Sequence, residues 1–366
     1  MPTLNEVTLV IPAYNRPAYL ERQIDFWSPT DVRLCILDGS KESAPQSLID
    51  RMGSNIYYRH LPIGFNERLV MACDLVQTKY VALLGDDELY APNGLQDCID
   101  TLEADSRLIA CVGRTMYFFE RDGEIFGNQV YEKSENLVHA FDSDIERLKE
   151  SLNDIERSPY LLYGLFRTSA WKKTVRVSYG RKYASGYVYE FAFHLIATLL
   201  GPTRMVESIV WMRSGENKAM SSDAVNRKIG MGEWGTDVRY VDEVTYFVDA
   251  IVDVVVAEGR LTKAQLHDAL LQAVQGFVKY SLHKPRRPIA YWHRTLYFIA
   301  RHTPRFLKQL LKRNMPTMLG TALDYRGVLM AEAVAEMRNR GITSREEEMQ
   351  GLESFLLAFH KKLTSD

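Results

Sequence analysis

Cysteine is scarce in this sequence, and its placement excludes two common structural roles. The 366 residues contain four cysteines, and none belongs to a CxxC pair or has the Cys/His spacing of a zinc site. A disulfide framework is not expected in a chain of this length with so few cysteines. We therefore expect reduced, mostly buried thiols at Cys35, Cys73, Cys98 and Cys111.

Long apolar runs are absent as well. No run reaches the roughly 18 apolar residues that indicate a membrane-spanning helix. The most apolar helical stretch, Tyr246–Val256, is interrupted by Asp249 and Asp253. The polar residues 1–6 lead directly into an apolar segment, so no signal peptide is expected. These features predict a soluble cytoplasmic protein that is attached at most to the inner face of a membrane.

Neither sign of charge dominates the chain. It contains 45 Lys and Arg against 47 Asp and Glu, a formal net charge of −2 at pH 7. Such a balance predicts no nucleic-acid partner. Hydrophobic residues make up 46% and charged residues 25%, which is ordinary for a globular protein and argues against wholesale disorder.

Short apolar segments alternate with amphipathic ones through roughly the first 220 residues. Segments rich in β-branched and aromatic residues predict strands at 7–12, 34–37, 56–60, 80–84, 109–119, 160–167 and 206–213. Helical periodicity is present at 17–27, 45–52, 67–76, 94–102 and 190–200. This order predicts βαβ units and a mostly parallel sheet, which binds ligands at the carboxyl ends of its strands. The polar residues 123–158 are expected to form a loop and one helix.

The pattern changes after about residue 221, and from Asp237 onward the chain is expected to be helical. We predict an α/β catalytic domain over residues 1–225 and a helical domain over residues 226–366. The second domain is a candidate for membrane-surface contact or dimerisation.

The strongest chemical signal is an acidic turn, Gly85-Asp86-Asp87-Glu88, directly after an apolar strand. Neighbouring carboxylates repel one another, so a site where a cation relieves the field is favoured. Oxygen ligands at a strand end suit Mg²⁺ or Mn²⁺ bound together with substrate phosphates. An exposed turn that caps the helix beginning near Pro92 explains the same acids equally well. The turn alone does not decide between these interpretations.

Further motifs stand in order along the first 220 residues. The turn Pro12-Ala13-Tyr14-Asn15 ends the first strand, Leu37-Asp38-Gly39-Ser40 ends the second, and Gly64 lies 23 residues before Asp87. With the acidic turn, these resemble the "IPxYN", "DDGS" and "GxxxARN…DxDD" segments of the family 2 glycosyltransferases. The resemblance implies a GT-A fold, which is Rossmann-like, and a nucleotide-sugar donor. Gly85 and Leu37 depart from the pattern, because each replaces an acid of the family motif.

The resemblance also implies roles for particular residues. Asp87 is the expected metal ligand with Asp86 beside it, and Mn²⁺ or Mg²⁺ is the expected cofactor. Asp38 is expected to read the nucleotide base. Further donor contacts are expected from Pro12, Tyr14, Asn15, Arg68, Asp86 and Arg213, the last of them through the diphosphate.

The catalytic base is expected about 100 residues after the acidic turn, at the start of a helix. Glu190 of the Tyr189-Glu190 pair has this position in the chain. In the family, inverting transfer uses such a carboxylate to remove the proton of the acceptor hydroxyl. The alternative is an ordinary exposed acid that the helix dipole stabilises.

A long segment near the C-terminus is basic and free of acids. Residues 269–323 contain no Asp or Glu, and ten basic residues fall within 279–313 among several aromatic ones. This composition is typical of a segment that lies on an anionic membrane surface. Packing on the catalytic domain, with the bases facing its acids, explains it as well. A homodimer face is a further alternative.

Together these features predict transfer of a sugar from a nucleotide-diphosphate donor to a hydroxyl of a glycan, lipid-linked or protein acceptor. One alternative is a sugar-phosphate nucleotidyltransferase, which needs a Gly-rich phosphate loop where Pro12–Pro17 stands here. The other is a catalytically degenerate nucleotide-sugar-binding protein, suggested by Gly85.

Overall fold

Four parallel strands form the centre of the structure. The computed structural model describes residues 3–131, 143–153, 161–217, 229–259, 262–283 and 327–365. Strands β1 (Val7–Ile11), β2 (Arg33–Asp38), β3 (Ile56–His60) and β4 (Tyr80–Leu83) lie in the order β3-β2-β1-β4, and each neighbouring pair is parallel. All five residues of β1 are buried because helices cover both faces of the sheet there.

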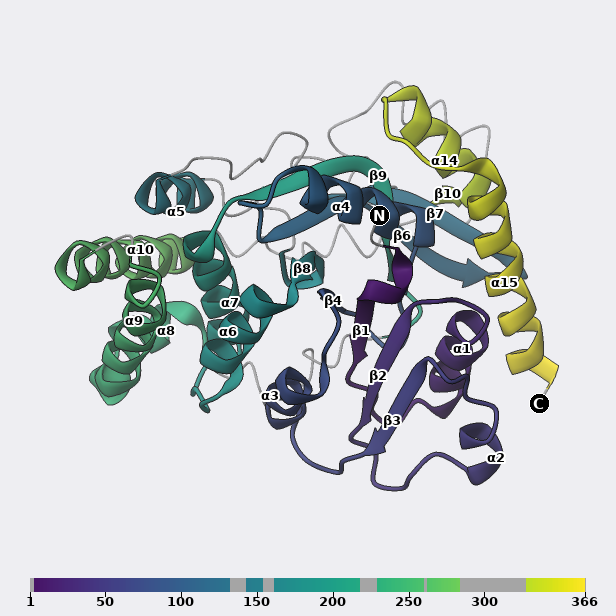
Figure 1. The fold of residues 1–366 in the computed structure, drawn as a ribbon, viewed down its shortest axis with the longest axis horizontal. Helices are drawn as coiled ribbons and strands as arrows, with labels where there is room; N and C mark the ends of the chain where they lie inside the picture. Colours follow the sequence, from purple (N-terminus) through teal and green to yellow (C-terminus); the bar gives the residue numbers. More distant parts are fainter. Residues whose placement is uncertain are drawn as a thin grey trace, which may run out of the picture.

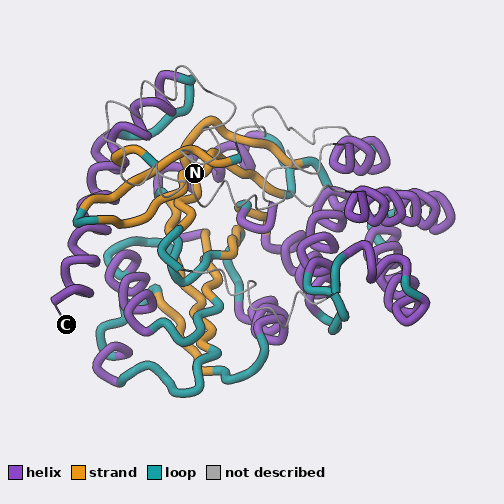
Figure 2. Tube along the Cα trace, turned by 180° about the vertical axis from the view of Figure 1, so that it is seen from behind, coloured by secondary structure: helices purple, strands orange, loops and turns teal. Residues whose placement is uncertain are grey.

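The other half of the sheet is mixed. Its strands are β5 (Leu89–Tyr90), β6 (Ala110–Arg121), β7 (Glu124–Val130), β8 (Leu165–Arg167), β9 (Thr203–Ser214) and β10 (Val328–Leu329). Eight of the ten strands lie in the order β10-β7-β6-β8-β4-β1-β2-β3, and β5 and β9 lie off this path. Strand β9 runs parallel to β6 and pairs antiparallel with β5. Figure 2 shows the strands between two groups of helices.

Helices cover the two faces of the central sheet. Helices α1 (Pro17–Trp27) and α4 (Pro92–Ala104) share one apolar cluster with β1 and β2. Helices α3 (Phe65–Leu75), α6 (Thr168–Tyr179) and α7 (Tyr187–Leu200) share another cluster on the opposite face. In α1 the buried Leu20, Ile24 and Trp27 follow helical spacing, which orients this helix on the sheet. The described residues also include the short helix α2 (Gln46–Ile49) and three 3₁₀ turns, Leu4–Glu6, Leu161–Tyr163 and Val238–Tyr240.

The remaining helices form two groups at opposite ends of the molecule (Figure 1). Helices α5 (Asp144–Asn153), α8 (Met231–Thr236), α9 (Val241–Val256) and α10 (Lys263–His283) pack with α7 around one apolar cluster. Helices α14 (Met330–Asn339) and α15 (Glu346–Ser365) pack over β6, β7 and β9. Both clusters therefore combine residues from the two predicted domains, and the division at residues 225 and 226 stays a prediction.

The predicted fold class is confirmed: an α/β core with a parallel central sheet is followed by a mainly helical C-terminal part. The prediction of a loop and one helix over residues 123–158 is wrong for residues 124–130, which form β7. This strand exists because it pairs antiparallel with β6, and such pairing overrides a weak local preference. Helix α6 also lay outside the predicted elements.

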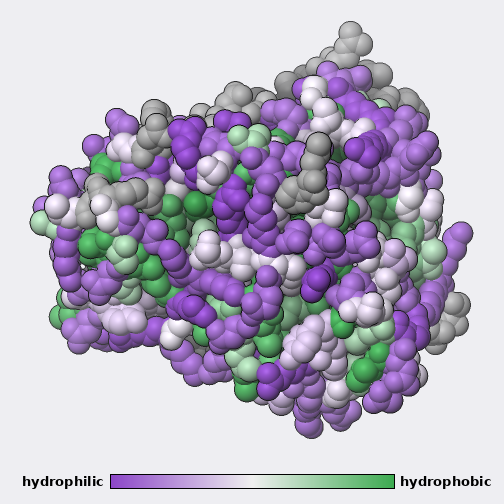
Figure 3. Space-filling view, viewed as in Figure 1, coloured by the Kyte–Doolittle hydropathy of each residue, from purple (hydrophilic) through white to green (hydrophobic). Residues whose placement is uncertain are grey.

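Contact of the C-terminal part with a membrane surface, and a homodimer, both stay predictions. Most of the basic segment 279–313 lies outside the described residues, which end at His283 and resume at Gly327. Within the described part of the chain, no helix is long and apolar enough to cross a membrane. Figure 3 shows apolar residues interrupted by polar ones on the left, over α9 and α10. Exposed apolar side chains of this region are Val238, Val241, Tyr246, Tyr280 and Leu282.

Candidate active site

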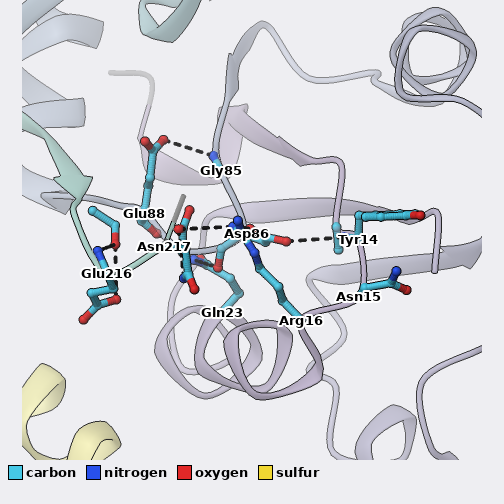
Figure 4. Close-up of polar contacts among 12 residues, drawn as sticks. Tyr14, Asn15, Arg16, Gln23, Gly85, Asp86, Glu88, Glu216 and Asn217 are labelled. Carbon is cyan, nitrogen blue, oxygen red and sulfur yellow. Dashed lines mark hydrogen bonds and ion pairs between the residues drawn. The ribbon is translucent and has the colours of Figure 1, made fainter. Parts of the chain in front are cut away.

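The carboxyl ends of β1, β2 and β4 meet at one edge of the sheet, where parallel sheets bind ligands. Tyr14 follows β1, Asp38 ends β2, and Asp86 follows β4. The backbone N–H of Tyr14 donates a hydrogen bond to Asp86 Oδ2 over 3.3 Å, and Figure 4 shows the two residues facing each other. The structure therefore brings together predicted site residues from three strands.

Asp38 is buried beside the turn that follows β1. The Tyr58 hydroxyl donates to Asp38 Oδ2 and the Ser40 backbone N–H to Oδ1, each over 2.9 Å. The Ser40 hydroxyl oxygen accepts from the backbone N–H of Asn15 over 2.8 Å. Asn15 has φ of 52°, a left-handed conformation that asparagine tolerates better than most residues. These contacts join the predicted base-recognition acid and the Asn15 turn into one hydrogen-bonded unit.

Arg68 lies behind this turn, in the interior. Its Nη1 donates to the carbonyls of Ala13 over 2.5 Å and of Leu37 over 2.7 Å. A Cβ atom on Gly39 would lie 2.5 Å from Arg68 Cζ, so only glycine leaves room for the guanidinium. Pro12 is buried at the same strand end. Arg68 thus holds the ends of β1 and β2 together, and its contact with a donor stays a prediction.

Arg16 pairs with both aspartates of the acidic turn. Its Nη1 lies 2.8 Å from Asp86 Oδ1 and 3.1 Å from Asp87 Oδ2. Burial raises the pKa of the Asp86 carboxyl, while the Arg16 charge opposes the rise. Asn217 Nδ2 donates to Asp87 Oδ2 over 3.0 Å. Two neighbouring carboxylates therefore share one guanidinium, which reduces their mutual repulsion.

Glu88 fills the space beside Gly85. Its Oε2 accepts hydrogen bonds from Trp211 Nε1 over 3.0 Å and from the Gly85 backbone N–H over 3.3 Å. A Cβ atom at position 85 would lie 2.9 Å from this oxygen. Burial, with the Asp87 charge adding to it, raises the pKa of Glu88 to about 8. Position 85 is glycine, where the family motif has an acid, because the protonated Glu88 side chain occupies the space that a side chain at position 85 would need.

Arg213 and Glu190 reach the same region from β9 and α7. Arg213 Nη1 donates to the Tyr131 hydroxyl over 2.5 Å. The Tyr131 ring lies parallel to Trp211, with centroids 6.3 Å apart. Burial raises the pKa of Tyr131, the Arg213 charge opposes this, and the charges of Glu88 and Glu190 add to it. Glu190 is exposed, and its charge acts on the Tyr131 hydroxyl. Its role as a catalytic base stays a prediction.

The acidic turn offers oxygen ligands of the kind that Mg²⁺ and Mn²⁺ prefer. Asp87 is its most accessible carboxylate, with a side chain 14% exposed against 5% for Asp86. Within the described residues, no group of three His, Cys, Asp or Glu is arranged to hold a metal. One accessible carboxylate fits a cation that completes its coordination with substrate phosphates and water. The donor set therefore fits the predicted cofactor at Asp87 with Asp86 beside it.

Replacing Glu88 with Gln should change how stability depends on pH. The folded chain keeps a proton on Glu88 up to about pH 8, whereas the unfolded chain releases it above about pH 4.5. The contribution of Glu88 to the free energy of unfolding is therefore complete below pH ~4.5 and is lost as the pH rises to ~8. Glutamine has the size of a protonated glutamate and stays uncharged at every pH, so the stability of Glu88→Gln should not fall over this pH range.

The measurement is thermal unfolding in EDTA at pH 5 and pH 8.5. We expect the Tm of the wild type to fall by about 5 °C relative to Glu88→Gln over this interval. The exposed Glu347→Gln serves as the control and should follow the wild type at both pH values. Parallel curves for wild type and Glu88→Gln would contradict the protonated assignment.

Arg16, directly before α1, and Arg22 and Gln23 on α1 belong to the site although the sequence motifs did not predict them. Arg16 contacts both carboxylates, and its position directly after the "IPxYN"-like turn is a signal that could have identified it. Arg22 donates to the Asp87 carbonyl over 2.5 Å, and Gln23 to the carbonyls of Asp86 and Glu88 over 3.0 and 2.6 Å. Arg22 and Gln23 look like ordinary helix residues, so only the packing of α1 shows their role.

Part of the chain that carries these site residues matches a known protein family. The sequence model described as "Glycosyl transferase family 2" matches residues 8–160, which include β1 to β7 and the acidic turn. The match covers less than half of the chain, and it supports a glycosyltransferase with a GT-A-like fold. This agrees with the resemblance seen in the motifs. Glu190 and Arg213 lie outside the matched residues.

Some solved structures are similar to the chain at low sequence identity. S. aureus TarS 1–349 in complex with UDP-GlcNAc has a TM-score of 0.48 and 12% identity, and 93% of each chain is covered. The glucosyl-3-phosphoglycerate synthase from Mycobacterium tuberculosis, in complex with Mn²⁺ and UDP-glucose, has a TM-score of 0.36 and 18% identity. That comparison covers 59% of this chain and 72% of the synthase. A search of curated proteins finds no match.

Proposed function

We propose that this glycosyltransferase moves a sugar from a nucleotide-diphosphate donor to a hydroxyl of a glycan, lipid-linked or protein acceptor, with inversion. Surface polysaccharide or glycoconjugate synthesis is the proposed setting. The observation that carries the proposal is the arrangement at one sheet edge: Asp38 and the acidic turn lie beside the Asn15 turn. The Glu190 charge acts on Tyr131, which lies in the same region. The family 2 domain supplies the reaction class.

The donor is proposed to bind across the ends of β1, β2 and β4. Asp38 accepts hydrogen bonds from the base, and its Tyr58 and Ser40 partners hold the carboxylate in place. Arg213, whose forked guanidinium suits two phosphate oxygens, pairs with the diphosphate. Mn²⁺ or Mg²⁺, when bound by Asp87 with Asp86 beside it, supplies positive charge to the leaving diphosphate.

The acceptor is proposed to approach from the side of α7. Glu190 accepts the proton of the acceptor hydroxyl while the oxygen attacks the anomeric carbon of the donor sugar. The exposed position of Glu190 on the first turn of α7 leaves the carboxylate accessible to such a substrate. Contact of residues 279–313 with an anionic membrane, and a homodimer, remain further proposals.

Calorimetry with UDP, GDP, CDP and dTDP, each with and without Mn²⁺, tests the donor site. We expect one of the four to bind only when Mn²⁺ is present, because the diphosphate and the acidic turn otherwise repel each other. Binding of none of them would contradict the proposal. Turnover of sugars carried by the nucleotide that binds then separates an enzyme from a protein that only binds the donor.

A further inference from the structure

The C-terminal helix contacts the active-site loop although it lies far away in the sequence. The loop consists of Ser214, which ends β9, and the following residues 215–217, and the side chain of its Glu216 is buried. Nε2 of His360 on α15 forms a hydrogen bond with Glu216 Oε1. Figure 4 shows α15 in yellow at the lower left, beside Glu216. A residue about 140 positions later therefore contacts the loop directly.

Arg22 carries this contact on to the acidic turn. Its Nη1 donates to Glu216 Oε2 over 2.8 Å and its Nη2 to the Asp87 carbonyl over 2.5 Å. The Arg22 side chain is completely buried, with Cζ 4.7 Å from the ring centroid of Tyr19 and 4.8 Å from that of Phe359. A guanidinium held between two rings has little freedom to find other partners. His360, Glu216, Arg22 and Asp87 thus form one continuous chain of polar contacts.

A second contact joins the same loop to the Asp87 carboxylate. Asn217, next to Glu216, donates to Asp87 Oδ2 over 3.0 Å and also hydrogen-bonds the Tyr19 side chain. Glu216 is held in addition by Ser214, whose hydroxyl donates to Oε2 over 3.2 Å. Movement of Glu216 would therefore shift both the backbone and the carboxylate of Asp87.

We propose that α15 is a positioning element of the active site and that His360 is the positioning residue, holding the loop 214–217 against Asp87. The consequence for catalysis rests on the proposed function, because it requires Asp87 to hold the metal and donor. His360 itself touches neither. Without its imidazole, the buried Glu216 Oε1 loses its donor on α15, and the loop loses its attachment to that helix.

Amide hydrogen exchange without any ligand tests the contact itself. In His360→Ala we expect exchange in residues 85–88 and 214–217 to become about tenfold faster, because local opening becomes easier. His360→Gln keeps a side-chain N–H donor and should recover part of the protection. Lys362→Ala is the matched control, since Lys362 lies on the same helix and pairs with the partly exposed Glu21 of α1 and not with the loop 214–217. Equal exchange in His360→Ala and Lys362→Ala would overturn the proposal.

Binding of UDP with Mn²⁺, or of whichever nucleoside diphosphate the wild type binds, tests the functional consequence. His360→Ala should weaken this binding about tenfold, as removal of a residue that orients a metal ligand typically does. In an Asn217→Ala background the same change should cost less than in the wild type, because one of the two contacts that carry its effect from the loop to Asp87 is already removed. Fully additive losses would overturn the proposal. A wild type that binds no nucleotide would refute the proposed function, and hydrogen exchange would still decide the role of His360.

Discussion

Asp87→Asn is expected to lower the rate of sugar transfer by about a hundredfold or more. The amide keeps the size of the side chain but removes the negative charge that a hard cation such as Mn²⁺ needs. Asp86 is less accessible than Asp87, and Glu88 is buried and protonated. Neither of these two acids can therefore fully replace Asp87. Initial rates over a Mn²⁺ titration measure the effect, and the apparent metal affinity should fall together with the rate.

Two further variants make this test specific. Asp100→Asn changes an acid on α4 that hydrogen-bonds only a nearby exposed Gln96 in the described contacts, and it should leave the rate unchanged. Asp38→Asn should weaken nucleotide binding in the presence of Mn²⁺ without changing the apparent Mn²⁺ affinity, whereas Asp87→Asn should lower the apparent Mn²⁺ affinity itself. Full activity of Asp87→Asn would refute the metal assignment.

Glu190→Gln is expected to lower kcat between about a hundredfold and ten-thousandfold, the range of general-base contributions. The KM for the donor should change little, because Glu190 lies on α7 and not on the strand ends that carry Asp38 and Asp87. Steady-state kinetics with the donor and acceptor varied separately measures both constants. Nucleotide binding by calorimetry should equal that of the wild type.

The control for this variant is Asp242→Asn. Asp242 is also an exposed acid in the first turn of a helix, α9, so it shares any stabilisation by the helix dipole. A small, equal loss of stability in both variants together with unchanged kcat would show that Glu190 is an ordinary helix-terminal acid. A large fall in kcat confined to Glu190→Gln supports the base.

The central elements could be predicted because their signals are local. Helix α1 begins and ends where its periodicity predicted, at Pro17 and Trp27, and β3 has its predicted bounds. The motif residues Tyr14, Asp38 and Asp86 meet because parallel strands place their carboxyl ends at one edge. Strand β7 could not be predicted in this way, since its pairing with β6 determines its conformation.

The sequence by itself determined the order of strands and helices, the family 2 motifs and the position of the acidic turn, because these depend on residue type and short spacing. Only the tertiary structure decided which charges meet at that turn. Arg16 pairs with both acids, burial keeps Glu88 protonated, and His360 reaches Glu216 from the end of the chain. Burial and long-range contact depend on how the elements pack, so no local pattern could contain them.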